Sequence, residues 1–172
     1  MEEYKLPELP YACNALEPYV DEATMRLHHD KHHAAYVNGF NAAQKKLEEA
    51  RAKGDFAPIR ALSLALAFHG SGHILHSLFW KSMCPKEKSV EPTSGAFLEQ
   101  VKKDFGSLEA FKKHFSEAAK AVEGSGWCAL AFEPTNRQLF ILQIENHQKQ
   151  IIQNCQILLV LDVFEHAYYL KH

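Results

Sequence analysis

The spacing of apolar and polar residues predicts a helical first half of the chain. Apolar positions recur at helical spacing from Asp21, a residue type that caps helix N-termini, to about Ala52. A second helix is expected to begin at Pro58, because the fixed φ angle of proline suits a first turn, and to end before Pro85. Two long helices joined by a short turn form a helical hairpin, preceded here by an extended, proline-containing segment.

Three glycines fall inside these predicted helices. Glycine in a helix interior costs roughly 1 kcal/mol relative to alanine. We therefore expect Gly39 to kink the first helix, and Gly70 and Gly72 to interrupt the second.

The composition changes over residues 84–94, which read CPKEKSVEPTS. We expect this segment to link an N-terminal helical hairpin domain, residues 1–88, to a C-terminal α/β domain, residues 89–172. Two further helices are predicted in the second domain, because apolar stripes at helical spacing cover residues 97–105 and 108–122.

Near residue 127 the helical period gives way to strands. Residues 127–132 and 139–144 flank the turn sequence Pro-Thr-Asn-Arg and are expected to form a strand–turn–strand unit. A third strand, residues 157–163, is apolar except for Asp162 and is expected to be buried on both faces. Helices followed by strands indicate an α+β fold, a long N-terminal hairpin followed by a mixed α/β part with a three-stranded antiparallel sheet.

Composition excludes several classes of function. The 172 residues are 47% hydrophobic and 23% charged, as in a globular protein. Nineteen basic and 21 acidic residues give a formal charge of −2, which argues against a nucleic-acid partner. The longest aliphatic run, residues 157–161, is far shorter than the ~20 residues of a membrane span, so no membrane partner is expected.

Four cysteines are present and none forms a Cys-x-x-Cys pair, which argues against zinc-ribbon and thioredoxin-like sites. The first residues contain no apolar signal segment. We therefore expect reduced thiols in a cytoplasmic protein.

Histidine is unusually abundant, with 11 residues, and most of them lie in three clusters. The first cluster, HHDKHHAAY, places His28, His32 and Tyr36 at i, i+4 and i+8, on one face of a helix. Two imidazoles and a phenol therefore lie on the same face of the predicted helix.

The second cluster places His69, His73 and His76 at i, i+4 and i+7 on the second helix. The third begins at the end of the last predicted strand, where Asp162 stands four residues before His166. Each of these clusters is also compatible with an ordinary solvated helix face or an i, i+4 charge pair.

Together the clusters predict a metal site, because neutral imidazoles and one carboxylate suit iron, manganese or zinc. An open coordination position would make the site catalytic. At this level no reaction is assigned, and a non-redox zinc enzyme or a metal-storage helical protein stays open.

Beyond spacing, the motifs resemble those of the iron/manganese superoxide dismutase family over nearly the whole chain. The matching stretches are LPELPY at 6–11, ALEP at 15–18, HHDKHHAAYV at 28–37, GHILHSLFW at 72–80, DFGS at 104–107, GSGW at 124–127 and DVFEHAYYL at 162–170.

The resemblance implies an enzyme that converts superoxide to dioxygen and hydrogen peroxide at one Mn or Fe ion. It implies that four residues bind this metal, namely His28, His76, Asp162 and His166.

Further roles are implied for residues around the metal. His32 and Tyr36 would line the path of the substrate, and His147 would hydrogen-bond the solvent on the metal. Trp80 and Trp127 would wall the pocket. The other clustered histidines would have packing, supporting or surface roles, namely His29, His33, His69 and His73.

The resemblance also implies a homodimer or a dimer of dimers. Glu165 and Tyr169 would reach across a two-fold interface, to His166 and His32 of the second copy.

The sequence departs from the family pattern at three places. Phe164 stands where the family usually has tryptophan, and Leu75 where asparagine is common. The chain ends at His172, where the family continues into C-terminal helices, so a catalytically impaired, truncated metal-binding homologue is the alternative. Gly72 stands where typical iron enzymes carry glutamine, and His147 occurs with either metal, so Mn and Fe both stay open.

Overall fold

The first arm of the hairpin is one long helical stretch in the computed structural model, which describes residues 2–172. Asp21 caps its start by accepting a hydrogen bond from the amide of Thr24 at 2.7 Å. Gly54, with a φ of 65°, ends it in the left-handed conformation. The stretch consists of α1 (Glu22–Leu27), a π-helical segment η1 (His28–His33) and α2 (Ala34–Lys53).

The π-helical segment corrects the expectation of a regular helix over this histidine cluster. The amide of Ala34 donates to the carbonyl of His29, five residues earlier, which is the wider spacing of a π turn. A π turn accommodates an extra residue without breaking the helix, so the first cluster stays helical but with a changed angular spacing.

The second arm is α3 (Ile59–Lys81), which is continuous. The expected interruption at Gly70 and Gly72 is therefore wrong, and α2 is likewise continuous through Gly39. The reason is packing between the arms. A Cβ atom on Gly72 would lie 2.7 Å from the ring of Tyr36, and one on Gly39 would lie 2.5 Å from the ring of His69. These glycines let α2 and α3 approach closely.

The second half contains two helices and a sheet. After the short 3-10 turn η2 (Lys86–Lys88) come α4 (Ala96–Phe105) and α5 (Leu108–Lys120). The strands are β1 (Gly126–Glu133), β2 (Gln138–Glu145) and β3 (Gln156–Asp162), in the antiparallel order β2-β1-β3. The 3-10 turn η3 (Glu165–Ala167) follows β3. The predicted α+β fold is confirmed.

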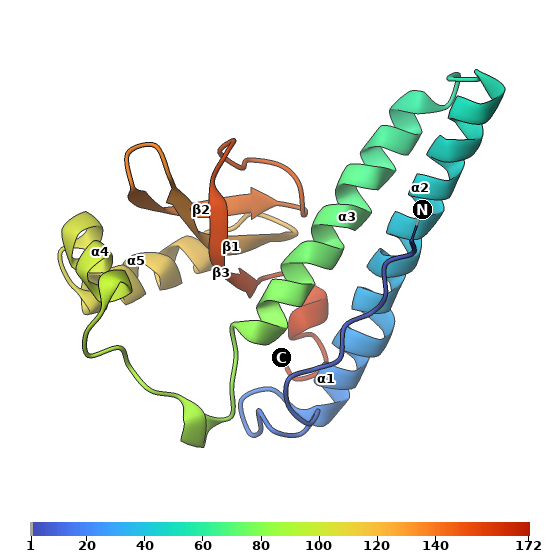
Figure 1. The fold of residues 1–172 in the computed structure, drawn as a ribbon. Coiled ribbons are helices and arrows are strands. Elements are labelled where there is room, and N and C mark those ends of the chain that lie inside the picture. The colour runs from blue at the N-terminus through green and yellow to red at the C-terminus, as the bar shows by residue number, and fades with distance from the viewer. Residues whose placement is uncertain (1) are drawn as a thin grey trace.

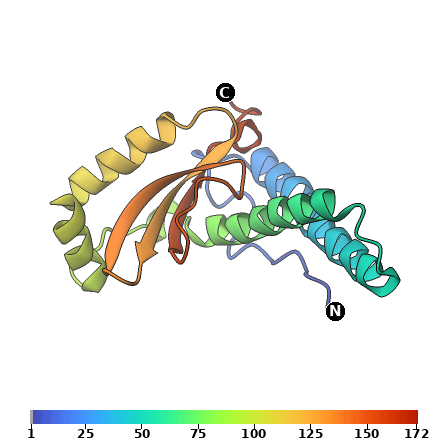
Figure 2. The same cartoon turned by 90° about the horizontal axis from the view of Figure 1, so that it is seen from above.

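The sheet lies between the hairpin on one side and α4 and α5 on the other (Figures 1 and 2). Trp127 and Ala129 of β1 join the core shared with α3, whereas Leu130 joins the core shared with α4 and α5. This alternation follows from the period of two in a strand. The central strand is thus buried on both faces.

β3 differs from the expectation that it would be buried on both faces. Leu158 and Leu161 are 43% and 38% exposed, whereas Val160 is buried. β3 is an edge strand, and α5 packs against β1 and β2 rather than β3. Among residues 2–172, no helix is both long and apolar enough to cross a bilayer.

Candidate metal centre

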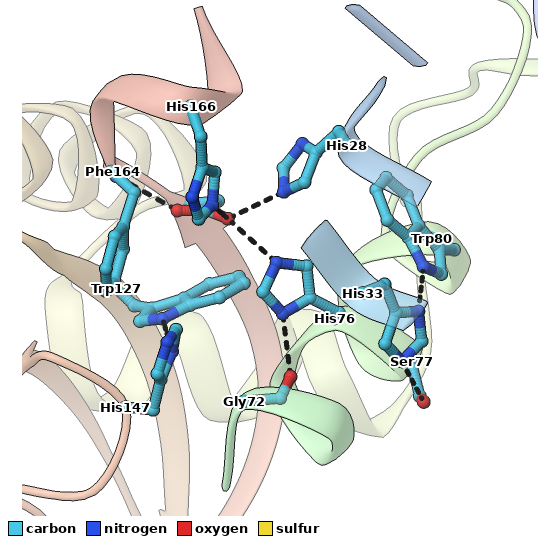
Figure 3. A network of polar contacts seen from close by, with 11 residues as sticks. His28, His33, Gly72, His76, Ser77, Trp80, Trp127, His147, Phe164 and His166 are labelled. Carbon is cyan, nitrogen blue, oxygen red and sulfur yellow. Dashed lines mark hydrogen bonds and ion pairs between the residues drawn. The ribbon is translucent and has the colours of Figure 1, made fainter. Parts of the chain in front are cut away.

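Four side chains meet where the hairpin packs against the sheet. One ligand atom from each of them lies within 4.8 Å of the others. His28 comes from η1, His76 from α3, Asp162 from the end of β3 and His166 from η3. Figure 3 shows the three imidazoles pointing toward one another. The group therefore joins both arms of the hairpin to the sheet, and it contains the four residues that the sequence nominated as metal ligands.

One carboxylate oxygen stands at the centre of this group. Oδ2 of Asp162 is 3.0 Å from Nε2 of His28 and 3.0 Å from Nε2 of His166. Nε2 of His76 lies 3.5 Å from the same oxygen. The other oxygen, Oδ1, accepts the backbone N–H of Phe164 at 3.0 Å, which fixes the orientation of the carboxylate.

His76 shows why the group fits a cation. Its Nδ1–H donates to the carbonyl of Gly72 at 2.7 Å, so the neutral imidazole carries a lone pair on Nε2. This Nε2 is fully buried and has no hydrogen-bond partner among the described residues. A lone pair that faces a carboxylate oxygen is repelled unless a positive charge lies nearby. The donor set of three imidazoles and one carboxylate suits Fe or Mn.

The electrostatics favour the ligating protonation states. Burial lowers the pKa of His28 and holds that of His76 well below its usual range. Burial alone would raise the pKa of Asp162, but hydrogen bonds from His166 and His28 outweigh it and lower that pKa. Neutral imidazoles and an ionised carboxylate are the forms that bind metal ions.

His147 lies beside this group rather than in it. The indole N–H of Trp127 donates to its Nδ1 at 3.0 Å, so the proton of the neutral ring sits on Nε2. Nε2 is buried and lacks a partner among the described residues, and burial lowers the pKa of His147 to about 4. Its ring centroid is 5.9 Å from that of His76. His147 therefore offers one unused N–H donor next to the four residues.

Tyr36 and His32 flank the group on its half-buried side. The ring centroid of Tyr36 lies 5.0 Å from that of His76 and 4.5 Å from that of His147. Burial raises the pKa of Tyr36 to about 12, so its hydroxyl stays protonated at neutral pH. His32 stacks on His166 at a centroid distance of 4.6 Å, and its Nε2 is buried without a partner among the described residues.

Comparison with known protein families shows which family this chain belongs to. The model of the iron/manganese superoxide dismutase alpha-hairpin domain matches residues 3–84. The model of the C-terminal domain of the same enzymes matches residues 93–172. The chain belongs to the iron/manganese superoxide dismutase family. The resemblance inferred from the motifs is confirmed.

Individual members of this family are similar along almost the entire chain. The chain is 53% identical to a superoxide dismutase [Fe] of Pyrobaculum aerophilum, with 98% of this chain and 80% of the relative covered. It is 47% identical to a superoxide dismutase [Fe] of Methanothermobacter marburgensis, with 98% and 84% covered. It is 46% identical to a superoxide dismutase [Mn/Fe] of Aeropyrum pernix, with 98% and 79% covered.

Within this family member, sequence reasoning missed a second histidine network behind the four residues. The indole N–H of Trp80 donates to Nδ1 of His33 at 2.9 Å, which leaves the His33 proton on Nε2. That N–H donates in turn to Nδ1 of His73 at 2.9 Å. His33 also stacks on His76 at 5.3 Å. The sequence does contain the residues of this network, but the spacing of residues within one helix cannot reveal a contact between two helices.

Proposed function

We propose that this chain is a superoxide dismutase in which His28, His76, Asp162 and His166 hold a single Fe or Mn ion. The buried Nε2 of His76, which faces the Asp162 carboxylate and lacks a hydrogen-bond partner among residues 2–172, carries this assignment. The relatives at 46–53% identity, named superoxide dismutases, support it. Such an ion, which has +3 and +2 states, would supply one-electron chemistry.

The reaction consumes two superoxide anions and two protons. One anion loses an electron and leaves as dioxygen, and the other gains that electron and both protons to become hydrogen peroxide. The protein therefore has to bind an anion and deliver protons. Asp162 contributes one negative charge to the site and the three imidazoles contribute none, so a bound cation keeps a net positive charge that attracts the anion.

Proton handling falls to the residues beside the ligands. Nε2–H of His147 is a donor without a partner in the described chain, and Trp127 holds it in that form. Tyr36 lies against His147 and keeps its hydroxyl proton. We assign catalytic roles to His147 and Tyr36 as donors facing the substrate, and to His32 at its half-buried entrance.

The assembly is proposed to be a homodimer or a dimer of dimers. Glu165 and Tyr169 lie just beyond the ligand-bearing end of β3, and both are exposed in the single chain. In a two-fold arrangement, Glu165 would meet His166 of the second copy and Tyr169 would meet its His32. Each site would then depend on residues from both copies.

Two further assignments follow the same reasoning. The chain is proposed to divide into domains of residues 1–88 and 89–172, in keeping with the separate family models for residues 3–84 and 93–172. The protein is proposed to work in the cytoplasm, because its four cysteines, all in the described chain, are free thiols.

The test is superoxide decay catalysed by the purified chain loaded with iron or with manganese. We expect catalysis with at least one metal in the wild type. Asp162→Ala should lose both metal and catalysis, whereas His114→Ala, on α5, should retain both. A wild type that binds metal but leaves the superoxide decay rate unchanged would contradict the proposal and favour an impaired metal-binding homologue.

A further inference from the structure

Four aromatic rings at the metal centre stack on one another in successive pairs. His32 stacks on His166 at 4.6 Å with an interplanar angle of 25°. His166 stacks on Phe164 at 4.8 Å and 13°, and Phe164 stacks on His147 at 4.6 Å and 6°. Phe164 thus stacks on both a proposed ligand and the proposed proton donor, and Figure 3 shows the three side chains.

The backbone of Phe164 fixes the place of its ring. Its N–H donates to Oδ1 of Asp162 at 3.0 Å, while Oδ2 faces the imidazoles. The residue stands directly before η3, and its side chain is 9% exposed. The hydrogen bond fixes the backbone of Phe164, and the packing around its buried side chain then fixes the plane of the ring.

The other rings close to His147 do not lie parallel to it: Tyr36 and Phe68 meet its imidazole edge-on, at interplanar angles of 75° and 62°. The hydrogen bond from Trp127 fixes Nδ1 at one point, but the imidazole can still tilt about that point. The nearly parallel face of Phe164 removes this tilt. Nε2 of His147, without a partner among the described residues, is then aimed in one direction.

We propose that Phe164 is a positioning residue that sets the plane of His147. The ring thereby aims the Nε2–H of His147 at the metal centre. This role rests on the proposed function of the four ligands. An aromatic ring at position 164 is required for it, and an apolar side chain of similar volume is not sufficient.

The experiment follows the hydrogen bond between Trp127 and His147 by NMR, with diamagnetic zinc loaded in the site. The chain has two tryptophans, so two indole N–H signals are expected, and Trp80→Phe identifies the signal of Trp127. Phe164→Leu should speed the exchange of the Trp127 indole proton by about tenfold or more, because His147 can then tilt. Phe164→Tyr, which keeps the ring, should restore slow exchange.

Phe79→Leu is the matched control. Phe79 is 7% exposed and packs on Trp127 at 5.9 Å, but it makes no ring contact with His147. Its replacement opens a similar cavity beside the same indole and should leave the exchange rate within about twofold of wild type. Equal exchange rates in Phe164→Leu and Phe79→Leu would overturn the proposal.

A second measurement tests whether the plane of His147 affects the activity of the metal centre. Phe164→Leu should keep its metal but change the ratio of manganese-loaded to iron-loaded activity by about tenfold, the scale seen for residues that support metal ligands. An unchanged ratio would overturn the role of Phe164 at the centre. A wild type that binds no metal would refute the proposed function instead, and indole exchange in the full-length chain would still decide whether Phe164 holds His147.

Discussion

Trp127 determines which nitrogen of His147 carries a proton, because its indole N–H occupies Nδ1 at 3.0 Å. The same relationship occurs a second time, where Trp80 donates to Nδ1 of His33 at 2.9 Å. Both tryptophans are almost fully buried. The two pairs differ in what lies beyond the histidine: Nε2 of His147 lacks a partner in the described chain, whereas Nε2 of His33 donates to His73.

The first prediction uses this difference. Trp127→Phe removes the donor to His147 and frees its tautomer, so turnover should fall about 10–100-fold while metal content is unchanged. Trp80→Phe also removes an indole donor, but its histidine partner is not aimed at the centre, so the loss should be at least several-fold smaller. Steady-state superoxide kinetics and metal analysis of both variants test this. Equal losses in the two variants would show that the tautomer of His147 does not matter.

The close approach of α2 and α3 allows a second matched pair. Gly72→Ala would place a Cβ 2.7 Å from the Tyr36 ring, and Gly39→Ala would place one 2.5 Å from the His69 ring. Both variants should lower the free energy of unfolding, by about 1–3 kcal/mol. Only Gly72→Ala displaces a catalytic side chain, so only it should lower kcat. Thermal unfolding and kinetics together test this, and a comparable fall of kcat in Gly39→Ala would contradict it.

These glycines also show what sequence reasoning can reach. The caps, the helical period and the strand–turn–strand pattern are local, so the hairpin and the three strands could be predicted from Asp21, Pro58 and the apolar runs after residue 126. Whether an internal glycine interrupts a helix or permits a close approach depends on the neighbouring helix, here on Tyr36 and His69.

In the candidate site, too, the sequence predicts some features and not others. Spacing places His28 and His76 on their helices, but the contact of His28 with Asp162 spans 134 positions, and only the family resemblance connected them. The stack of Phe164 on His147 follows from the turns after β2 and β3, including a φ of 53° at Asn146. Periodicity carries no information about such ring orientations.

The third prediction concerns pH. Burial and the neighbouring His73 lower the pKa of His33 to about 3 in the folded protein, from an ordinary value of 6.5. Below pH 6.5 the imidazole of His33 becomes protonated in the unfolded chain but stays neutral in the folded chain. The free energy of unfolding therefore falls as the pH falls. One such histidine accounts for about 2 kcal/mol between pH 6.5 and 5, since each pH unit is worth about 1.4 kcal/mol.

His33→Gln isolates this effect, because glutamine offers a donor and an acceptor but does not titrate. The variant should be less stable than wild type at pH 7, and the difference should shrink by about 2 kcal/mol at pH 5. Urea unfolding of the metal-free proteins at both pH values gives the two differences. A difference that does not change with pH would show that His33 is not held neutral by the fold.

The fourth prediction tests the assembly. A two-fold interface uses each contact twice, so Glu165→Ala would remove two charge-assisted hydrogen bonds, each worth roughly 1.5–3 kcal/mol. Its dimer should dissociate at a protein concentration at least tenfold higher than wild type requires. Glu87→Ala, at an exposed glutamate on η2, should leave the assembly unchanged. Light scattering across a dilution series measures this, and a fully active wild-type monomer would refute the interface.

The fifth prediction tests the central claim, that one Fe or Mn ion is held by His28, His76, Asp162 and His166. The measurement is metal content per chain after loading and removal of loose ions, in wild type, His76→Ala and His69→Ala. The two variants each remove one histidine of α3, but only His76 belongs to the ligand group. We predict about one ion per chain in wild type and in His69→Ala, and almost none in His76→Ala. Full metal content in His76→Ala would contradict the account.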